Sequence, residues 1–253
     1  MRYLILSDIH ANAIALEAVL EDAKSRSWQS VMFLGDAVGY YTDPEAVVAC
    51  LIGLKPEIAI MGNHDQILLD IHQGNEEALK RSKSIVTKLL SHHHQQLSQP
   101  SLDFLASLKM RDNGIYWQAI HGGLKEPWEY LDNLQAVQKN IPLLETNLCF
   151  FGHTHIPIIY AQTTSSKGDL WRSIPFTQDY MVYSIPPKAK LFVNPGSVGQ
   201  PRDHIPKASY AIFDEGTRKI EFFRVEFDIP KAQERVQMLQ YPEVLALRLA
   251  QGR

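Results

Sequence analysis

Five short segments of the sequence are rich in side chains that bind metal ions. They are Asp8-Ile9-His10, Gly35-Asp36, Gly62-Asn63-His64-Asp65, His121-Gly122-Gly123 and Gly152-His153-Thr154-His155. A mixture of carboxylate and imidazole suits a first-row divalent ion, whereas Mg²⁺ and Ca²⁺ prefer oxygen alone. Seven of the side chains are ligand candidates, which is more than one ion with open positions needs. We therefore predict a two-metal hydrolase whose ligands are Asp8, His10, Asp36, Asn63, His121, His153 and His155.

Two ions about 3.5–4 Å apart can hold a phosphoryl group and activate a hydroxide that bridges them for in-line attack. Asp36 could bridge the ions through its two oxygens, and manganese, iron, nickel or zinc would suit the donors, with manganese favoured. His64 is needed by neither ion, so we expect it to stabilise developing charge or protonate the leaving oxygen. Asp65 is predicted to accept the ring N–H of His64 and fix its tautomer, which makes the two residues a catalytic pair.

The elements that must position these side chains can be recognised from the apolar pattern. Runs at 3–6, 31–34 and 58–61 predict buried strands, and helical spacing at 12–25 and after Asp43-Pro44 predicts the connections between them. Alternation of this kind predicts an α/β fold with a parallel sheet and right-handed crossovers. Because such sheets bind ligands at the carboxyl ends of their strands, we expect the segments to converge there.

The rest of the chain is predicted to complete one domain over residues 1–253. Residues 66–110 have a helical pattern and are predicted to form a helical insertion packed beside the site. Further strands at 116–120 and 149–151 would deliver the three later histidines. Residues 156–253 form a β-rich half that ends in a helical tail from Ile229, with a polar loop or hairpin at 163–180.

Composition restricts the partners and the compartment. The 253 residues are 45% hydrophobic and 21% charged, with a formal net charge of -3. This charge disfavours a long nucleic acid, because no strong basic field is present, but it is compatible with a small phosphorylated substrate. No apolar run approaches membrane-spanning length, and the first residues lead directly into a strand. With Cys50 and Cys149 interpreted as buried thiols, we expect a cytoplasmic protein whose oligomeric state is left open.

The order and spacing of the five segments resemble a known family. Asp-x-His, Gly-Asp, Gly-Asn-His-Asp, a lone His before Gly and Gly-His-Thr-His are together similar to the motifs of the calcineurin-like metallophosphoesterases, over residues 3–204. The resemblance implies a mixed α/β (α+β) fold, a four-layer αββα sandwich of two facing mixed sheets. It also implies His64 as catalytic histidine, one ion held by Asp8, His10, Asp36 and His155, and another held by Asp36, Asn63, His121 and His153.

Two further segments, 35–44 and 194–202, look like a subgroup of small bacterial and archaeal members. That subgroup is described as phosphodiesterases or phosphatases, and some relatives cleave dinucleoside polyphosphates. It often has glycine where Tyr41 stands here. The resemblance therefore implies hydrolysis of small phosphodiesters, nucleotides or related esters.

Two alternatives remain open. A protein serine/threonine phosphatase would use the same chemistry in a shallow groove, whereas a cleft roofed by residues 66–110 would favour small molecules. A non-catalytic scaffold on the same fold is the alternative from another class, and members of that type lack the catalytic histidine that His64 matches here.

Several side chains near the motifs have two interpretations. Arg202 could pair with phosphate or be a surface arginine, and Tyr40 could reach the substrate pocket or serve packing. Ser197 is interpreted as a turn residue whose loop supports the ligands. The run 92–94 of three histidines is predicted to form a solvated helix face, because consecutive helical side chains diverge around the axis.

Overall fold

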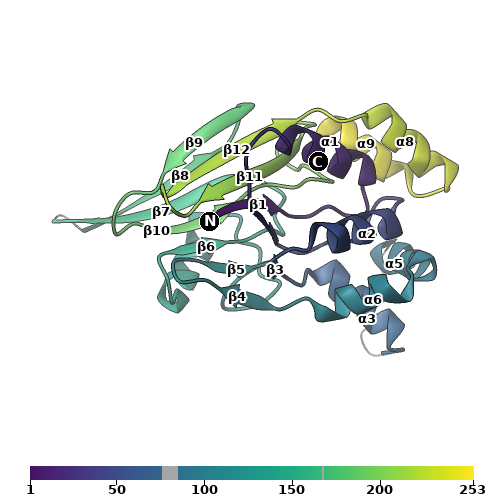
Figure 1. The fold of residues 1–253 in the computed structure, drawn as a ribbon, viewed down its shortest axis with the longest axis horizontal. Helices are drawn as coiled ribbons and strands as arrows, with labels where there is room; N and C mark the ends of the chain where they lie inside the picture. Colours follow the sequence, from purple (N-terminus) through teal and green to yellow (C-terminus); the bar gives the residue numbers. More distant parts are fainter. Residues whose placement is uncertain (76–84, 167) are drawn as a thin grey trace.

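Two six-stranded sheets lie face to face at the centre of the molecule (Figure 1). The structure is a computed structural model that describes residues 1–75, 85–166 and 168–253. Helices cover the outer face of each sheet. The predicted sandwich of two mixed sheets is therefore confirmed.

The first sheet has the strand order β3-β2-β1-β11-β12-β9. Its parallel half is built from β1 (Arg2–Leu6), β2 (Ser30–Phe33) and β3 (Ile58–Ala59). Two helices connect these strands, α1 (Ala13–Ala23) and α2 (Pro44–Leu54), as the apolar spacing predicts. Antiparallel strands complete the sheet, namely β11 (Ala208–Asp214), β12 (Lys219–Val225) and β9 (Tyr180–Ser184).

The second sheet has the strand order β4-β5-β6-β10-β7-β8. Its parallel strands are β5 (Gln118–Ile120), β6 (Leu148–Phe150) and β10 (Lys190–Asn194). Its antiparallel edges are β4 (Arg111–Asn113) on one side, and β7 (Ile158–Ser165) and β8 (Gly168–Pro175) on the other. The polar stretch 163–180 is thus largely the β7–β8 hairpin, with residue 167 outside the described residues. The outer face carries α7 (Leu134–Asn140) and the short 3₁₀ helix η1 (Ile141–Leu143).

Side-chain alternation along β1 shows how the layers form. Leu4 and Leu6 belong to the core under α1 and α2, whereas Tyr3 and Ile5 belong to the core between the sheets. Successive residues of a strand point to opposite faces, so a run of apolar residues can fill two cores at once. The strand is therefore buried on both sides.

Helices gather at one end of the sandwich, as Figure 1 shows. The predicted insertion contains α5 (Ile85–Gln96), α6 (Gln99–Ser107) and most of α3 (Asn63–His72), and its part at 76–84 lies outside the described residues. The tail forms α8 (Ile229–Met238) and α9 (Glu243–Gln251), which pack against each other. Among the described residues, no helix is long and apolar enough to cross a membrane. Both cysteines are free thiols, but only Cys149 is buried and Cys50 is partly exposed.

Candidate metal centre

The seven predicted ligands come together at one edge of the sandwich. Each follows the carboxyl end of a strand: β1 precedes Asp8 and His10, β2 precedes Asp36, β3 precedes Asn63, β5 precedes His121, and β6 precedes His153 and His155. All of them except partly exposed Asn63 are buried. The convergence follows from the topology, because parallel strands end at the same edge.

The backbone is strained at most of these ligands. Asp8, His10, Asp36, His153 and His155 have φ values of 53°, 52°, 60°, 65° and 61°. A residue other than glycine in this left-handed region costs on the order of 1–3 kcal/mol and needs surrounding contacts to hold it. Backbone hydrogen bonds supply such contacts, since the Asp8 N–H donates to Gly35 O at 3.0 Å and the His10 N–H donates to Asp36 O at 2.9 Å. Strain of this kind concentrates at functional sites.

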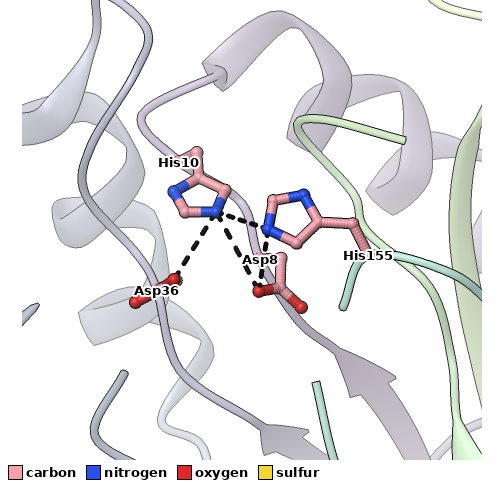
Figure 2. Close-up of side chains that lie close together, drawn as sticks. All are labelled: Asp8, His10, Asp36 and His155. Carbon is pink, nitrogen blue, oxygen red and sulfur yellow. Dashed lines mark hydrogen bonds and ion pairs between the residues drawn. The ribbon is translucent and has the colours of Figure 1, made fainter. Parts of the chain in front are cut away.

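The first group consists of Asp8, His10, Asp36 and His155, whose ligand atoms lie within 4.8 Å of one another. Figure 2 shows the side chains pointing toward one common position. The two Nε2 atoms of His10 and His155 are 3.0 Å apart. Carboxylate oxygens complete the cluster, with Asp8 3.3 Å from the His155 Nε2 and Asp36 3.5 Å from the His10 Nε2.

The hydrogen bonds of the imidazoles show that this group fits a cation. The Nδ1 of His10 lies 3.0 Å from Val38 O, and the Nδ1 of His155 lies 2.6 Å from Gln200 O. A carbonyl can only accept, so each Nδ1 carries the hydrogen and each neutral ring presents an Nε2 lone pair. Two lone pairs that face each other and two carboxylates repel unless a positive charge lies among them. A backbone carbonyl that fixes the tautomer is typical of metal-binding histidine.

The second group consists of Asp36, His121 and His153 and shares Asp36 with the first. The His121 Nε2 lies 3.3 Å from Asp36 and 3.3 Å from the Asn63 amide oxygen, and its Nδ1 lies 2.7 Å from Leu34 O. The buried Nε2 of His153 has no hydrogen-bond partner among the described residues. A buried ring nitrogen without a partner is costly, and a metal ion would satisfy it.

Electrostatics at the centre also favour a cation. Burial raises the pKa of Asp8 to about 7, because a carboxylate is poorly solvated there and Asp36 adds a like charge. Burial alone would lower the pKa of His121, but the charges of Asp36 and Asp8 and the hydrogen bonds to Asp36 and Leu34 O together outweigh it and raise the pKa to about 9. The two carboxylates therefore favour positive charge beside them. Divalent ions would provide the same compensation more fully.

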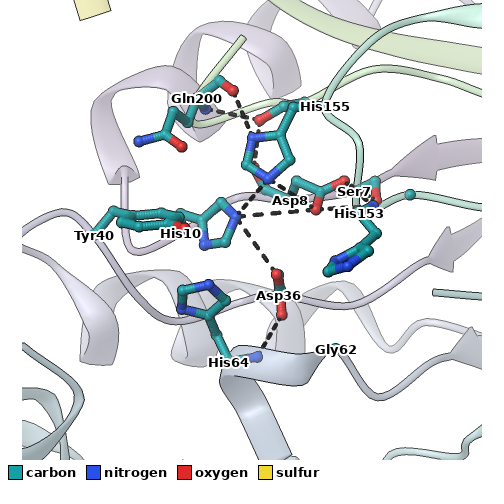
Figure 3. Close-up of polar contacts among 12 residues, drawn as sticks. Ser7, Asp8, His10, Asp36, Tyr40, Gly62, His64, His153, His155 and Gln200 are labelled. Atoms are coloured by element: carbon teal, nitrogen blue, oxygen red, sulfur yellow. Dashed lines mark hydrogen bonds and ion pairs between the residues drawn. The ribbon is translucent and has the colours of Figure 1, made fainter. Parts of the chain in front are cut away.

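His64 lies directly beside the two groups without belonging to either (Figure 3). Its backbone N–H donates to Asp36 Oδ1 at 2.9 Å, and its ring centre is 4.8 Å from that of His10. The ring Nδ1 is buried and has no partner among the described residues. Burial lowers the pKa of His64, so the ring is neutral near pH 7 and can offer an N–H to a neighbouring oxygen.

Asp65 does not contact the His64 ring, and the predicted hydrogen bond between them is wrong. Its two oxygens accept instead from the backbone N–H groups of Asp36 at 2.8 Å, Ala37 at 2.9 Å and Gly62 at 3.0 Å. The carboxylate satisfies donors that a buried, strained loop would otherwise leave unpaired. Asp65 therefore fixes the loop that carries Asp36.

Tyr40 and Arg202 both lie at the rim of the centre. The Tyr40 ring is centred 4.6 Å from the rings of both His10 and His64. Arg202 is half-buried and donates to the Tyr40 hydroxyl at 3.2 Å and to Gln200 Oε1 at 2.6 Å. Burial, followed by the charge of Arg202, lowers the pKa of His155, so this guanidinium acts electrostatically on the ligands.

Several supporting residues could not be recognised by motif. Ser7 donates to Asp8 Oδ2 at 2.6 Å, and the Tyr130 ring is centred 4.0 Å from that of His153. Ser197 donates to Asp8 O at 2.7 Å, in agreement with the supporting role expected for its loop. The role of Ser7 could have been inferred from its position beside Asp8 after a strand. Nothing in the sequence connects Tyr130 to the site.

His93 corrects the prediction of a solvated histidine face. His92 is exposed, but His93 is fully buried and accepts the Gly39 N–H on Nδ1 at 3.2 Å. Its Nε2 lies 2.6 Å from Tyr41 O, to which it donates. The signal was the spacing, because His93 follows Leu89 by four residues on the buried helix face.

Comparisons with known proteins agree with this site. The family model described as the calcineurin-like phosphoesterase superfamily domain matches residues 1–218. An uncharacterized protein of Methanocaldococcus jannaschii is 37% identical over 98% of this chain and 97% of its own length. The chain therefore belongs to the calcineurin-like phosphoesterase superfamily.

Solved structures give the same result for the whole fold. A metallophosphoesterase from Sphaerobacter thermophilus has a TM-score of 0.83 and 34% identity, covering 100% of this chain and 99% of that one. A hypothetical protein from Pyrococcus horikoshii has a TM-score of 0.75 and 21% identity, covering 100% of this chain and 98% of its own, and is a likeness of fold alone.

Proposed function

We propose that this protein is a dinuclear metal-dependent phosphoesterase that hydrolyses small phosphodiesters or nucleotides. The observation that carries the proposal is the position of Asp36, which belongs to both buried groups of candidate ligands. One ion would be held by Asp8, His10, Asp36 and His155, and the other by Asp36, Asn63, His121 and His153. Manganese is the ion we favour. The two free cysteines support the expected cytoplasmic location.

The residues of the chain divide the catalytic work. When bound, the ions would supply Lewis acidity toward the phosphoryl group and a nucleophile at neutral pH. His64 is neutral and its backbone is held on Asp36, so its ring N–H can donate a hydrogen bond that stabilises charge on an ester oxygen, whereas protonation of the leaving group would require the imidazolium form. Arg202 at the rim offers a fixed positive charge to a phosphate oxygen. Asp65 acts through the Asp36 loop and not by proton transfer.

A small substrate is favoured over a phosphorylated protein by the surroundings of the centre. A cavity of about 540 Å³ adjoins it and is lined by Tyr40, Arg202 and helix α9. That volume is within the usual range of small-molecule sites, about 300–1,000 Å³. Helix α9 lines this cavity, and none of the described residues of 66–110 does. The presence of His64 argues against a non-catalytic scaffold.

Hydrolysis of bis-p-nitrophenyl phosphate with Mn²⁺ tests the proposal. We expect turnover that is lost after chelation with EDTA and dialysis, and restored by Mn²⁺. The His64→Ala variant should keep its metal content, measured by mass spectrometry, while its kcat falls by about 100-fold or more. Full activity in the metal-free protein would refute the proposal, and loss of metal from the variant would instead make His64 a ligand.

A further inference from the structure

The cavity beside the metal centre has an unusual lining. It is bounded by Tyr40, Arg202, Val244, Leu247, Arg248, Gln251 and Arg253. Three of these seven side chains are arginines, and no acidic residue is among them. Such a surface attracts anions and repels cations.

Two guanidinium groups at this cavity, those of Arg202 and Arg248, are not neutralised by a carboxylate among the described residues. The arginine–carboxylate pairs among the described residues use Arg2, Arg26, Arg224 and Arg235, and neither Arg202 nor Arg248 has a carboxylate within 4.0 Å. The side-chain contacts of Arg202 are to neutral groups, Gln200 and the Tyr40 hydroxyl. Because these contacts use the Nε and Nη2 of Arg202, its Nη1 remains for a phosphate oxygen. Arg248 has no side-chain hydrogen bond among the described residues and can pair with phosphate through two parallel hydrogen bonds.

The position of α9 beside Arg202 is fixed by packing at both of its ends. Leu245 and Leu249 are buried in a cluster that includes Tyr41, the residue that follows Tyr40. After the helix, Gly252 has φ +61° and passes so close to the chain that a Cβ there would lie 2.7 Å from Ile205 N. Its carbonyl accepts from the His204 N–H at 2.8 Å. Arg248 is therefore held near Arg202 by a preformed contact.

Tyr40 connects the cavity with the metal centre. One side of its ring contacts His10 and His64, and its hydroxyl accepts from Arg202. Tyr40 therefore borders both the metal centre and this cavity, as binding of one molecule across the two would require. Val244 and Leu247, which are 46% and 49% exposed, offer apolar surface for the part of the molecule between its charges.

We propose that this cavity binds a second phosphate group of the substrate, so that the native substrate carries a phosphate in addition to the scissile ester. The proposal rests on the proposed phosphoesterase function and specifies its substrate class. Arg202 and Arg248 are its main contacts. Specificity then depends on α9, which contributes none of the candidate metal ligands.

Two matched substrates test the proposal on the manganese-loaded protein. They are the p-nitrophenyl ester of thymidine 5′-phosphate and the same ester with an added 3′-phosphate. We expect the added phosphate to lower KM by about 10-fold, the effect of one charge-assisted hydrogen bond. Arg248→Gln should remove most of this advantage. Arg172→Gln on the edge strand β8 loses the same charge at an exposed position and should retain it.

Equilibrium binding gives a second readout. Calorimetry with thymidine 5′-phosphate and thymidine 3′,5′-bisphosphate should show the same 10-fold preference, reduced in Arg248→Gln alone. Turnover of both esters with an unchanged KM ratio in Arg248→Gln would overturn the phosphate site and leave the phosphoesterase function intact. Arg248-dependent binding without turnover of either ester would support the phosphate site and overturn the phosphoesterase function. Stimulation of the simpler ester by free inorganic phosphate would show a separate anion in the cavity and would also overturn the proposal.

Discussion

The two ends of the central parallel strands differ in backbone conformation and in the side chains that they carry. At the carboxyl ends of β1, β2, β5 and β6 lie both groups of candidate ligands, and five of the candidate ligands, those after β1, β2 and β6, have left-handed backbone. The opposite end has the larger cavity, about 640 Å³, lined by residues such as Ile115, Tyr116 and Glu145. Ile115 there is 83% exposed. Among the described residues, no group of three or more candidate ligands lies at that second end.

The larger of the two cavities is therefore not the one that lies beside the candidate metal ligands. The cavity at the opposite end is bordered by the N-terminus and by turns, which tolerate exposed apolar side chains. The site end keeps two buried carboxylates and strained backbone, each of which costs stability unless a ligand or a network of contacts compensates for it. Unfavourable features that are held in place by many contacts are therefore the better indicator of function.

The largest effect that separates the two ends is expected from Asp36→Asn. This change keeps the shape of the side chain but removes the charge shared by both ligand groups. Loss of an outer contact to a metal ligand typically costs 10–100-fold, so loss of the shared ligand should cost more, about 1,000-fold or more in kcat/KM. Metal content by mass spectrometry should fall in parallel with hydrolysis of bis-p-nitrophenyl phosphate.

Glu145→Gln is the matched control at the opposite end. It is also an acid-to-amide change, in a side chain that lines the larger cavity and accepts from the Asn113 amide at 2.8 Å. Activity and metal content should stay within about twofold of the original protein. Similar losses of activity and metal in both variants would mean that the effect of Asp36→Asn is not specific to the end with the candidate ligands.

Close packing around His64 should produce the next largest effect. Gly39 has φ +98°, and a Cβ at this position would overlap the His64 Nδ1. Gly39→Ala should therefore displace the ring and lower kcat by about 100-fold, the size of a general acid–base contribution. Gly168→Ala is the control, because Gly168 has φ +108° but open space around its Cβ position. It should lose stability, by about 1 kcal/mol from backbone strain, and keep its activity.

Much of the site could be predicted from the sequence because its signals are local. Each of the five segments follows an apolar or mostly apolar run, and the end of a strand determines where its side chains lie. The strands and both connecting helices were therefore placed correctly, and the sandwich followed from the family resemblance. The roles of the ligands in binding metal remain predictions.

What could not be predicted depends on contacts between distant segments. Asp65 accepts from backbone N–H groups 27–29 residues earlier in the chain, and a motif cannot show that the loop bends over it. The approach of α9 to Tyr40 and Arg202 depends on how a tail of the chain packs around Tyr41. Motif reasoning assigns partners from neighbours in sequence, which is why it paired Asp65 with His64.

A third experiment tests whether the site end is sensitive to acid apart from its metal ligands. Burial lowers the pKa of His93 to about 4, and the neutral ring bridges Gly39 and Tyr41. The unfolded chain, with an ordinary pKa of about 6.5, binds the proton more readily. Stability from this group is therefore complete above pH 6.5 and is lost as the pH falls toward 4. Between pH 7 and pH 5 the loss should be about 2 kcal/mol.

Urea denaturation of the original protein and of His93→Gln at pH 7 and pH 5 measures how much His93 contributes to this change in the free energy of unfolding. The histidines among the candidate metal ligands are the same in both proteins, so their titration cancels when the two changes in free energy of unfolding are subtracted. The original protein should lose about 2 kcal/mol more than the variant. His92→Gln, one residue away on the exposed side of α5, should behave like the original. An equal loss of unfolding free energy in the His93 variant would contradict this prediction. It would mean that the hydrogen bonds of His93 to Gly39 and Tyr41 do not contribute to the acid sensitivity of this end.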